Sequence, residues 1–379
     1  MIFSTTSGNL GEVLVNLNRV INSKNALPIL ADIVFSVKDK TLSLKASDGE
    51  ITLTADIVLT EAAEGEGCFA VNAKNIMEAI KNLPETPLEF SVSEDEKKVK
   101  VDYFSGMFSL PIDNAEEFPV SPDMEETETK TFTISEGVLQ ENIARTIFAT
   151  DDNELRIVMN GIYFDFTPEH LAVVASDGHL LVRNKLMTIK AEENGAAGFI
   201  LPKKSAQILK TILRRTADDD VTISFDDRQA MIVAENFTMM CRLITGRYPN
   251  YNSVIPKNNP KIVRVERTTL IAALKRVSPF SNISNHLVCL SIEENKIQID
   301  TEDYDFSKKA SENIACDYTG EPIKIGLKGS MSLEILNGLN SKEVEIQLAD
   351  PSRPVLIIPV EQPADMDVLM LQMPMLISC

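Results

Sequence analysis

The sequence predicts an α+β protein of three similar domains, each with two helices packed on antiparallel sheets. Three motifs support this prediction, because each recurs in the same order at about one third of the chain length. Many short runs of alternating apolar and polar residues lie between these motifs and indicate half-buried strands. A chain of 379 residues is long enough for two or three domains.

The first motif is an amphipathic helix that follows a short opening strand. Its three copies read SGNLGEVLVNLNRVI, SEGVLQENIARTIFA and ERTTLIAALKRVSPF. Leu10, Leu139 and Leu270 hold the same place in these copies, so the motif repeats at nearly equal intervals. Each copy starts with Ser or Thr near acidic or polar residues, a pattern typical of helix N-caps.

The second motif is a strand and turn. TLSLKASDGEITL in the first copy matches HLAVVASDGHLLV in the second, and Ser47 and Ser176 are separated by the same interval as Leu10 and Leu139. An Asp-Gly pair between two alternating runs predicts a hairpin. The third copy, KIQIDTEDYDFS, is degenerate but keeps the alternation and the acidic turn.

The third motif is a strand that leads into a second helix. It reads FAVNAKNIMEAIKNL, FILPKKSAQILKTIL and KIGLKGSMSLEILNGL, with Phe69 and Phe199 again separated by about one third of the chain. Two polar stretches, 121–130 and 256–261, lie where the repeat begins again and are predicted to be linkers. We therefore expect domains at 1–127, 128–256 and 257–379.

The formal net charge of -19 argues against a protein that binds nucleic acid over its whole surface. A DNA-binding surface would have to be a local basic stripe on an acidic body. The segment 203–215, taken as a helix, offers such a stripe, because Lys203, Lys210 and Arg214 share one face and apolar residues occupy the other.

Other cations lie at related positions in the repeat. For any one helix taken alone, an ordinary solvated face is the favoured interpretation, but the basic line occurs at a repeated position in an otherwise acidic chain. Glu78 weakens the corresponding stripe of the first copy. The further cations are Lys204 and Arg215 beside the stripe, Lys74 and Lys81 in the first copy, Lys328 in the third, and Arg19, Arg145, Lys275 and Arg276 in the first-motif helices.

Composition and missing motifs disfavour several classes of protein. No run of about 18 apolar residues and no signal-peptide pattern occurs, so we expect a soluble cytosolic protein. The odd, irregularly spaced cysteines predict neither a disulfide framework nor a zinc site, and we expect no metal and no cofactor. These cysteines are Cys68, Cys241, Cys289, Cys316 and Cys379.

Four further motifs, in order along the chain, resemble the bacterial DNA polymerase III beta subunit, the DNA sliding clamp family. They are ALPIL (26–30), ASDGH (175–179), GRYPNYNSVIP (246–256) and MPM (373–375), and the resemblance covers essentially the whole chain. It implies the DNA clamp fold and a head-to-tail dimeric ring of six similar domains. Helices would line the hole around duplex DNA.

The resemblance also implies a non-catalytic function and a set of partners. The clamp would tether the DNA polymerase III catalytic subunit to its template and confer processivity. A separate ATP-driven clamp loader would open the ring, and other clamp-motif proteins would bind to it. We expect no membrane partner.

By the same resemblance, partners insert short apolar side chains into a pocket between the second and third domains. The pocket residues would be Met159, Ser176, Gly178, His179, Leu181, Pro249, Val254, Leu371, Met373, Pro374 and Met375. Methionines suit a surface that adapts to many partners. Leu180 and Ser253 stand where the family often has basic residues, and the apolar tail 376–379 is longer than usual.

Lys24 and Arg156 match family positions that face DNA. Together with the helix cations they complete the expected DNA-facing set: Lys24, Lys74, Lys81, Arg145, Arg156, Lys203, Lys204, Lys210, Arg214, Lys275 and Lys328.

The resemblance also implies that the ring interface joins the first domain of one chain to the third domain of the other, a head-to-tail contact that can close a ring. Phe108 and Leu110 would meet the segment around Pro279 and Phe280.

Two alternatives remain open from the sequence. An enzyme could use Asp177 and His179 as a catalytic pair, but the first repeat has the same Asp-Gly turn without a histidine, so a turn-forming aspartate is favoured. No G-x-x-x-x-G-K-[ST], G-x-G-x-x-G or H-E-x-x-H motif occurs. A repeat scaffold that binds only proteins would share the fold and the pocket but would need no inward-facing cations.

Overall fold

The computed structural model describes residues 1–22, 24–25, 27–93, 95–119, 124, 129–190 and 197–377. It divides into two compact units. Unit 1 comprises Met1–Gln140 and Gln207–Leu243, and unit 2 comprises Glu141–Ala206 and Ile244–Cys379. The expected central domain, 128–256, therefore contributes to both units. The expected boundary at 127/128 lies outside the described residues, as do Ala26 and Cys379.

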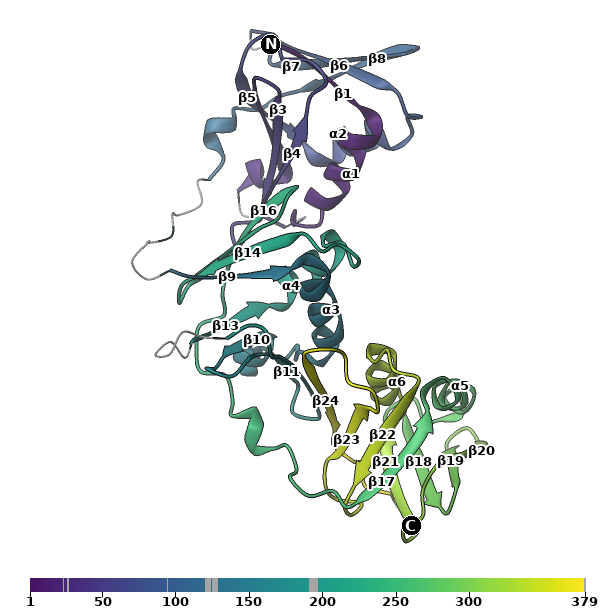
Figure 1. Ribbon diagram of the computed structural model, residues 1–379. Coiled ribbons are helices and arrows are strands. Elements are labelled where there is room, and N and C mark those ends of the chain that lie inside the picture. Colours follow the sequence, from purple (N-terminus) through teal and green to yellow (C-terminus); the bar gives the residue numbers. More distant parts are fainter. Residues whose placement is uncertain are drawn as a thin grey trace. The chain divides into compact units, whose positions relative to one another are not determined.

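Unit 1 contains two antiparallel sheets (Figure 1). The four-stranded sheet has the order β1 (Ile2–Thr6), β6 (Pro87–Ser93), β7 (Lys98–Tyr103), β8 (Gly106–Pro111). The eight-stranded sheet has the order β5 (Gly67–Asn72), β2 (Asp32–Lys38), β3 (Thr41–Ser47), β4 (Ile51–Val58), β16 (Phe237–Arg242), β15 (Gln229–Val233), β14 (Asp220–Phe225), β9 (Lys130–Ser135).

Unit 2 repeats this arrangement. Its eight-stranded sheet has the order β13 (Ala197–Pro202), β10 (Gly161–Phe166), β11 (Leu171–Ser176), β12 (Leu180–Leu186), β24 (Met366–Gln372), β23 (Val355–Pro359), β22 (Glu343–Leu348), β17 (Lys261–Glu266). Its four-stranded sheet has the order β20 (Lys308–Ala315), β19 (Lys296–Asp303), β18 (Leu287–Glu293), β21 (Ile323–Lys328).

Six α-helices occur among the described residues, two from each expected domain. They are α1 (Ser7–Leu17), α2 (Ala73–Lys81), α3 (Glu136–Thr146), α4 (Lys203–Ile212), α5 (Arg267–Val277) and α6 (Gly329–Gly338). Short 3₁₀ turns occupy Pro28–Ala31, Ala115–Glu117, Ile147–Ala149, Glu154–Met159, Tyr251–Ser253 and Ser278–Phe280. Helices α1 and α2 pack side by side, as do α5 and α6 (Figure 1). Among the described residues, no helix is long and apolar enough to cross a membrane.

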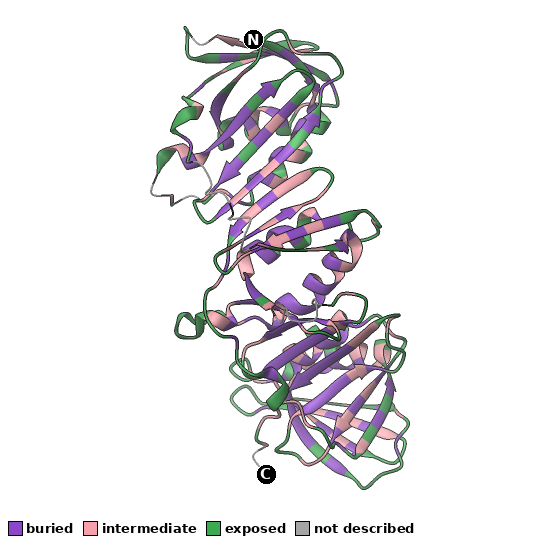
Figure 2. Ribbon diagram, turned by 60° about the vertical axis from the view of Figure 1, so that its left-hand side comes forward, coloured by how far each residue is buried: buried purple, intermediate pink, exposed green. Residues whose placement is uncertain are grey.

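Helix α1 shows why these segments become helices. The side chain of Thr6 accepts a hydrogen bond from the backbone N–H of Asn9 over 3.2 Å, which satisfies one free donor of the first turn. Leu10, Leu14 and Leu17 then follow at helical spacing and are all buried. Along the strands the spacing is two, so buried and more exposed positions alternate (Figure 2).

Two strand pairs join the repeats. Strand β4 pairs with β16 in unit 1, and β12 pairs with β24 in unit 2, both antiparallel. Each eight-stranded sheet thus combines four strands from one repeat with four from the next. The expected α+β fold of three similar two-helix domains on antiparallel sheets is confirmed.

The expected helix 203–215 is too long, because α4 ends at Ile212. The side chain of Leu213 is still buried, but Arg214 lies beyond the last helical turn. Arg214 therefore does not continue the helical line of Lys203 and Lys210, which corrects the expectation drawn from helical periodicity.

Candidate functional site

The turn between β11 and β12 is built by its own side chains. Asp177 Oδ1 accepts the backbone N–H groups of His179 over 2.8 Å and Leu180 over 2.6 Å. Ser176 Oγ donates to the carbonyl oxygen of Leu180 over 2.7 Å. Gly178 has φ +89°, a conformation that a residue with a Cβ adopts only with strain. These hydrogen bonds fix the turn, in which Gly178 and His179 are exposed at the end of the sheet.

The same turn occurs between β3 and β4 of the first repeat. Asp48 Oδ1 accepts from the backbone N–H of Ile51 over 2.7 Å, and Gly49 has φ +90°. Glu50 stands there in place of His179. Since the aspartate performs the same backbone task in both copies, the geometry assigns Asp177 to the turn and gives no support to a catalytic Asp-His pair.

An apolar cluster lies beneath this turn. Leu181 and Leu371 are directly opposite each other across the β12–β24 pair and are 1% and 3% exposed. They belong to one buried cluster with Ala172, Val174, Ile200, Tyr248, Tyr251, Leu356 and Leu369. The strand pairing between repeats therefore brings two predicted pocket residues together.

The two tyrosines of this cluster were not among the predicted site residues. Tyr248 and Tyr251 come from the irregular segment between β16 and β17, where periodicity gives no signal. Burial raises the pKa of both phenols well above the ordinary value, and Tyr251 also donates to Asp165 over 2.7 Å. The GRYPNYNSVIP motif thus supplies rings to the cluster as well as exposed residues.

The C-terminal segment is tied to both sides of this region. The backbone N–H of Met373 donates to the carbonyl oxygen of His179 over 2.7 Å. The backbone N–H of Met375 donates to the carbonyl oxygen of Gly326 in β21 over 2.8 Å. Met373 is 36% exposed, whereas Leu376 is 94% exposed. Pro374 lies between the two anchored residues and is partly exposed.

The other predicted pocket residues come from two segments that approach each other. Met159 is buried, whereas Pro249 and Val254 are exposed, with Val254 at 52%. A Cβ on Gly246 would stand 2.8 Å from Cγ1 of Val158, so the segments preceding Pro249 and Met159 are in close contact. Within the part of the chain that the structure describes, Pro249 and Val254 do not belong to the buried cluster beneath the turn.

Arg156 is placed at the turn. Its Nη1 donates to the carbonyl oxygen of Asp177 over 3.0 Å, and its Nη2 pairs with Asp151 over 2.8 Å. The side chain remains 43% exposed. Arg156 therefore braces the turn next to Gly178 while part of its guanidinium faces solvent.

The predicted DNA-facing cations differ widely in exposure. Lys24, Lys74, Lys81, Lys210 and Lys275 are exposed, whereas Lys203, Lys204 and Lys328 are half-buried.

Two of the half-buried lysines have acidic neighbours. Lys203 pairs with Asp152 over 2.6 Å. Burial raises the pKa of Glu334, and the nearby charges of Lys328 and Lys203 partly offset this.

The prediction of a DNA-facing role is wrong for Arg145. Its side chain is 2% exposed, its Nε donates to the carbonyl oxygen of Gly338 over 3.1 Å, and its guanidinium pairs with Glu141. Helical periodicity predicts which face of α3 carries Arg145. It does not predict that the C-terminal end of α6 packs against that residue. A charge buried in this way is not available to a phosphate.

Arg214 is exposed but engaged by three carboxylates. It pairs with Glu136 over 2.8 Å, Asp219 over 3.0 Å and Glu235 over 3.3 Å. The hydrogen bond and charge of Glu136 raise the pKa of Arg214. Its contribution to a basic stripe is therefore largely neutralised, which corrects the prediction of a line of three cations on this face.

The predicted interface residues lie on the edge strand of one sheet in unit 1 and in a turn of unit 2. Phe108 and Leu110 belong to β8, the last strand of its sheet in unit 1, and are partly exposed. Pro279 and Phe280 lie in the turn after α5 in unit 2, and Phe280 is 41% exposed. Arg276, in the last turn of α5, is tied to Glu312 of β20.

Three family models match the chain in succession. They describe the N-terminal, central and C-terminal domains of the DNA polymerase III beta subunit, over residues 1–122, 133–250 and 252–376. The chain belongs to the DNA polymerase III beta-subunit family. The alternative of a protein-binding scaffold without DNA contact is not favoured by this membership.

Relatives and solved structures of this family extend over the whole chain. The beta sliding clamp of Escherichia coli strain K12 is 27% identical over 375 residues, 99% of this chain and 100% of that protein. The beta sliding clamp of Haemophilus influenzae is 27% identical over 358 residues, 94% of this chain and 95% of that protein. The crystal structure of a DnaN sliding clamp from Pseudomonas aeruginosa bound to griselimycin has a TM-score of 0.92 at 26% identity and full coverage of both chains. The identification of the chain as a DNA sliding clamp is confirmed.

Proposed function

We propose that two copies of this clamp close head to tail into a ring of six similar domains around duplex DNA. The observation that carries this proposal is the way in which successive repeats are joined. Strand β4 pairs with β16, and β12 pairs with β24, so the same two strands of the repeat are used twice. Strand β20 corresponds to β4 and β12 in the repeat, and β8 corresponds to β16 and β24.

Strands β8 and β20 are both edge strands of their described sheets. The equivalent strands β4, β12, β16 and β24 each pair with a strand of a neighbouring repeat, whereas β8 and β20 have no such pairing within the described chain. An antiparallel β8–β20 pair between two chains would supply that partner and form the same joint a third time. Since both ends of one chain would be used by the other, two such joints would close a ring.

Exposed apolar side chains at both edges support this interface. Phe104 and Met107, in the β7–β8 hairpin, are 95% and 55% exposed. Tyr304 and Phe306, in the β19–β20 turn, are 80% and 64% exposed. Large apolar groups held open to water in this number are typical of a protein–protein interface.

We propose that DNA is held without sequence recognition by exposed lysines of the helices. The body of the protein repels other polyanions, because its net charge is -19. Lys74, Lys81, Lys210 and Lys275 are exposed and suit loose contact with phosphates. A ring that grips by topology needs no base contacts, and it can slide.

The apolar cluster of Leu181 and Leu371, together with the exposed Met373 and Val254, is the proposed docking site for partner peptides. The partners would be the DNA polymerase III catalytic subunit, the clamp loader and other clamp-motif proteins. The clamp would act in the cytoplasm as a processivity factor without catalysing a reaction. Its turn aspartate serves the backbone rather than a substrate.

The test is retention on DNA of defined topology. The clamp is loaded by a related bacterial loader onto nicked circular DNA, and the DNA is then linearised or left closed. A ring should stay on the circle and run off the linear form, whereas a clamp that binds by affinity alone should behave equally on both. Equal retention would overturn the proposal.

A further inference from the structure

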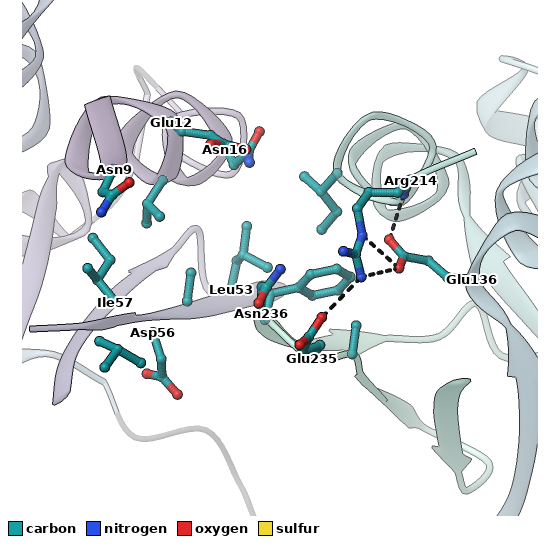
Figure 3. A pocket seen from close by; sticks show the side chains of 16 residues that line it. Asn9, Glu12, Asn16, Leu53, Asp56, Ile57, Glu136, Arg214, Glu235 and Asn236 are labelled. Atoms are coloured by element: carbon teal, nitrogen blue, oxygen red, sulfur yellow. Dashed lines mark hydrogen bonds and ion pairs between the residues drawn. The ribbon is translucent and has the colours of Figure 1, made fainter. Parts of the chain in front are cut away.

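Unit 1 contains a groove (Figure 3), and none of its lining residues belongs to the cluster proposed to bind partners. It is bounded by α1, by β4, by the start of α3, by the end of α4 and by the β15–β16 turn, and it holds about 410 Å³. This volume falls in the range of about 300–1,000 Å³ that is usual for ligand pockets. Leu53, Ile57 and Phe237 contribute apolar surface to it.

The polar lining of the groove is predominantly acidic. Glu12, Asp56, Glu136 and Glu235 line it, against a single arginine, Arg214. Glu136 and Glu235 both pair with that arginine, and Figure 3 shows all three side chains together on one side of the groove. Glu12, on the opposite side, is exposed and forms no ion pair with any residue that the structure describes. The groove therefore has an excess of negative charge.

The internal repeat shows what fills the corresponding space in unit 2. Asn16 of α1 and Arg145 of α3 hold the same place in the repeat, since each follows its equivalent leucine, Leu10 or Leu139, at the same distance along the chain. Arg145 donates through Nε to the carbonyl oxygen of Gly338, at the end of α6, over 3.1 Å. Its Nη1 lies 3.9 Å from Sδ of Met366, at the start of β24.

The surroundings of the two positions also correspond. Glu12 and Glu141 are equivalent in the repeat by the same alignment, and Glu141 pairs with Arg145. Ile212, which lines the groove at the end of α4, occupies the place that Gly338 takes at the end of α6. Unit 2 thus closes this space with a buried guanidinium, whereas unit 1 has the shorter, uncharged Asn16 and an open groove.

We infer that the groove in unit 1 binds an arginine side chain carried by a basic, partly apolar segment of a partner protein. The carboxylate of Glu12 would take the role that Glu141 has toward Arg145. The apolar floor would cover the methylene stem of the arginine and a neighbouring apolar side chain. A guanidinium fits better than an ammonium, because its planar fork meets carboxylate oxygens in pairs.

The binding test uses a fluorescein-labelled peptide of alternating leucine and arginine, titrated with the full-length protein. A second peptide carries citrulline, an uncharged isostere, in place of each arginine. The arginine peptide should bind and the citrulline peptide should bind at least about tenfold more weakly, since hydrogen bonds to charged groups are lost. Equal binding of the two, or no binding of either, would overturn the inference.

The site is located with variants of the groove. Asn16→Arg should fill the groove from within the chain, as Arg145 does in unit 2, and Glu12→Gln removes the unpaired charge. Each should weaken binding of the arginine peptide by about tenfold. Glu78→Gln, on the exposed face of α2, removes one charge elsewhere in unit 1 and should leave the affinity unchanged. If Glu78→Gln weakens binding as much as Glu12→Gln, the peptide binds by net charge and the groove is not its site.

A complementary experiment in unit 2 tests the repeat argument without a peptide. Arg145→Ala should open the corresponding space and lower the melting temperature. The N-ethylguanidinium ion should then raise the melting temperature of this variant more than that of the unaltered protein, whereas tetramethylammonium should not. Equal effects of the two ions would show that the space does not select a guanidinium, and the inference would be wrong. None of these experiments involves DNA, so failure here leaves the proposed ring function untouched.

Discussion

The backbone N–H of Met373 donates a hydrogen bond of 2.7 Å to the carbonyl oxygen of His179. This bond links the C-terminal segment to a turn whose shape is fixed by Asp177 and Gly178. The C-terminal segment is therefore held against the second repeat close to the Leu181–Leu371 pair. Changes to the tail should alter the surface there without disturbing the turn.

Deletion of residues 373–379 should weaken binding of a clamp-motif peptide by about tenfold or more, because both the Met373 side chain and its anchor to His179 are lost. Met373→Ala should have a smaller effect in the same direction. Deletion of only 376–379 keeps both backbone anchors and serves as the matched control. Fluorescence anisotropy measures the affinities. Full affinity after the longer deletion would exclude the tail from the site.

Leu110→Asp in β8 should convert the ring to monomers, because it places a charge in the proposed β8–β20 joint. Sedimentation should show the unaltered protein at about 84 kDa, twice the 41.9 kDa of one chain. Ile262→Asp on β17 is the control, since Ile262 is also an exposed apolar strand residue at 45% and lies in no proposed interface. A dimer that survives Leu110→Asp at low micromolar concentration would contradict the proposed joint.

Replacing Lys74, Lys81 and Lys210 together by glutamate should reduce loading onto DNA and polymerase stimulation. With each lost phosphate contact, the plot of log affinity against log salt concentration should become less steep by about 1. Lys98→Glu on the sheet strand β7 alters the net charge without touching a helix and is the control. If both variants reduce loading equally per charge, the helix lysines have no special position relative to DNA.

Asp32→Asn should stabilise unit 1 at neutral pH. Burial raises the pKa of Asp32 from 3.8 to about 6, Asn72 opposes this by donating a hydrogen bond, and the charge of Asp113 adds to the increase. A carboxyl whose pKa is raised by folding stabilises the native state fully below pH 3.8, and this contribution is lost as the pH rises through about 6.

The free energy of unfolding of the variant should therefore be larger than that of the unaltered protein by about 1–2 kcal/mol at pH 8, after allowance for solvent screening. The difference should shrink toward pH 4. Urea unfolding at a series of pH values measures it. A difference that is the same at both pH values would show that Asp32 does not titrate with folding.

Much of the fold follows from local chemistry and could be predicted directly from the sequence. The Asp-Gly turns at Asp48 and Asp177 form the predicted hairpins because each aspartate satisfies the backbone N–H groups of its own turn. The leucines of α1 are buried as helical spacing predicts. The turn forms in the first and second repeats because both contain the Ser-Asp-Gly residues that build it.

Which cations remain exposed to solvent, and so able to contact DNA, could not be predicted in the same way. Arg145 and Lys210 both look like surface charges on amphipathic helices, yet Arg145 is buried against the end of α6 and Lys210 is exposed. Arg214 lies past the end of its helix and is held by Glu136, which comes from the start of α3, far earlier in the chain. Helical periodicity describes one helix in isolation and contains no information on what packs against it.

The sequence by itself determined the threefold repeat, the family and the chemistry of the hairpin turns, because residues close together in the chain produce each of them. The tertiary structure alone decided that Leu181 faces Leu371, that Arg145 is buried against Gly338 within unit 2 whereas its counterpart Asn16 lines an open groove in unit 1, and that Arg214 is neutralised. Those outcomes depend on strands and helices far apart in the chain coming into contact, where burial and ion pairing change what the same residue type can do.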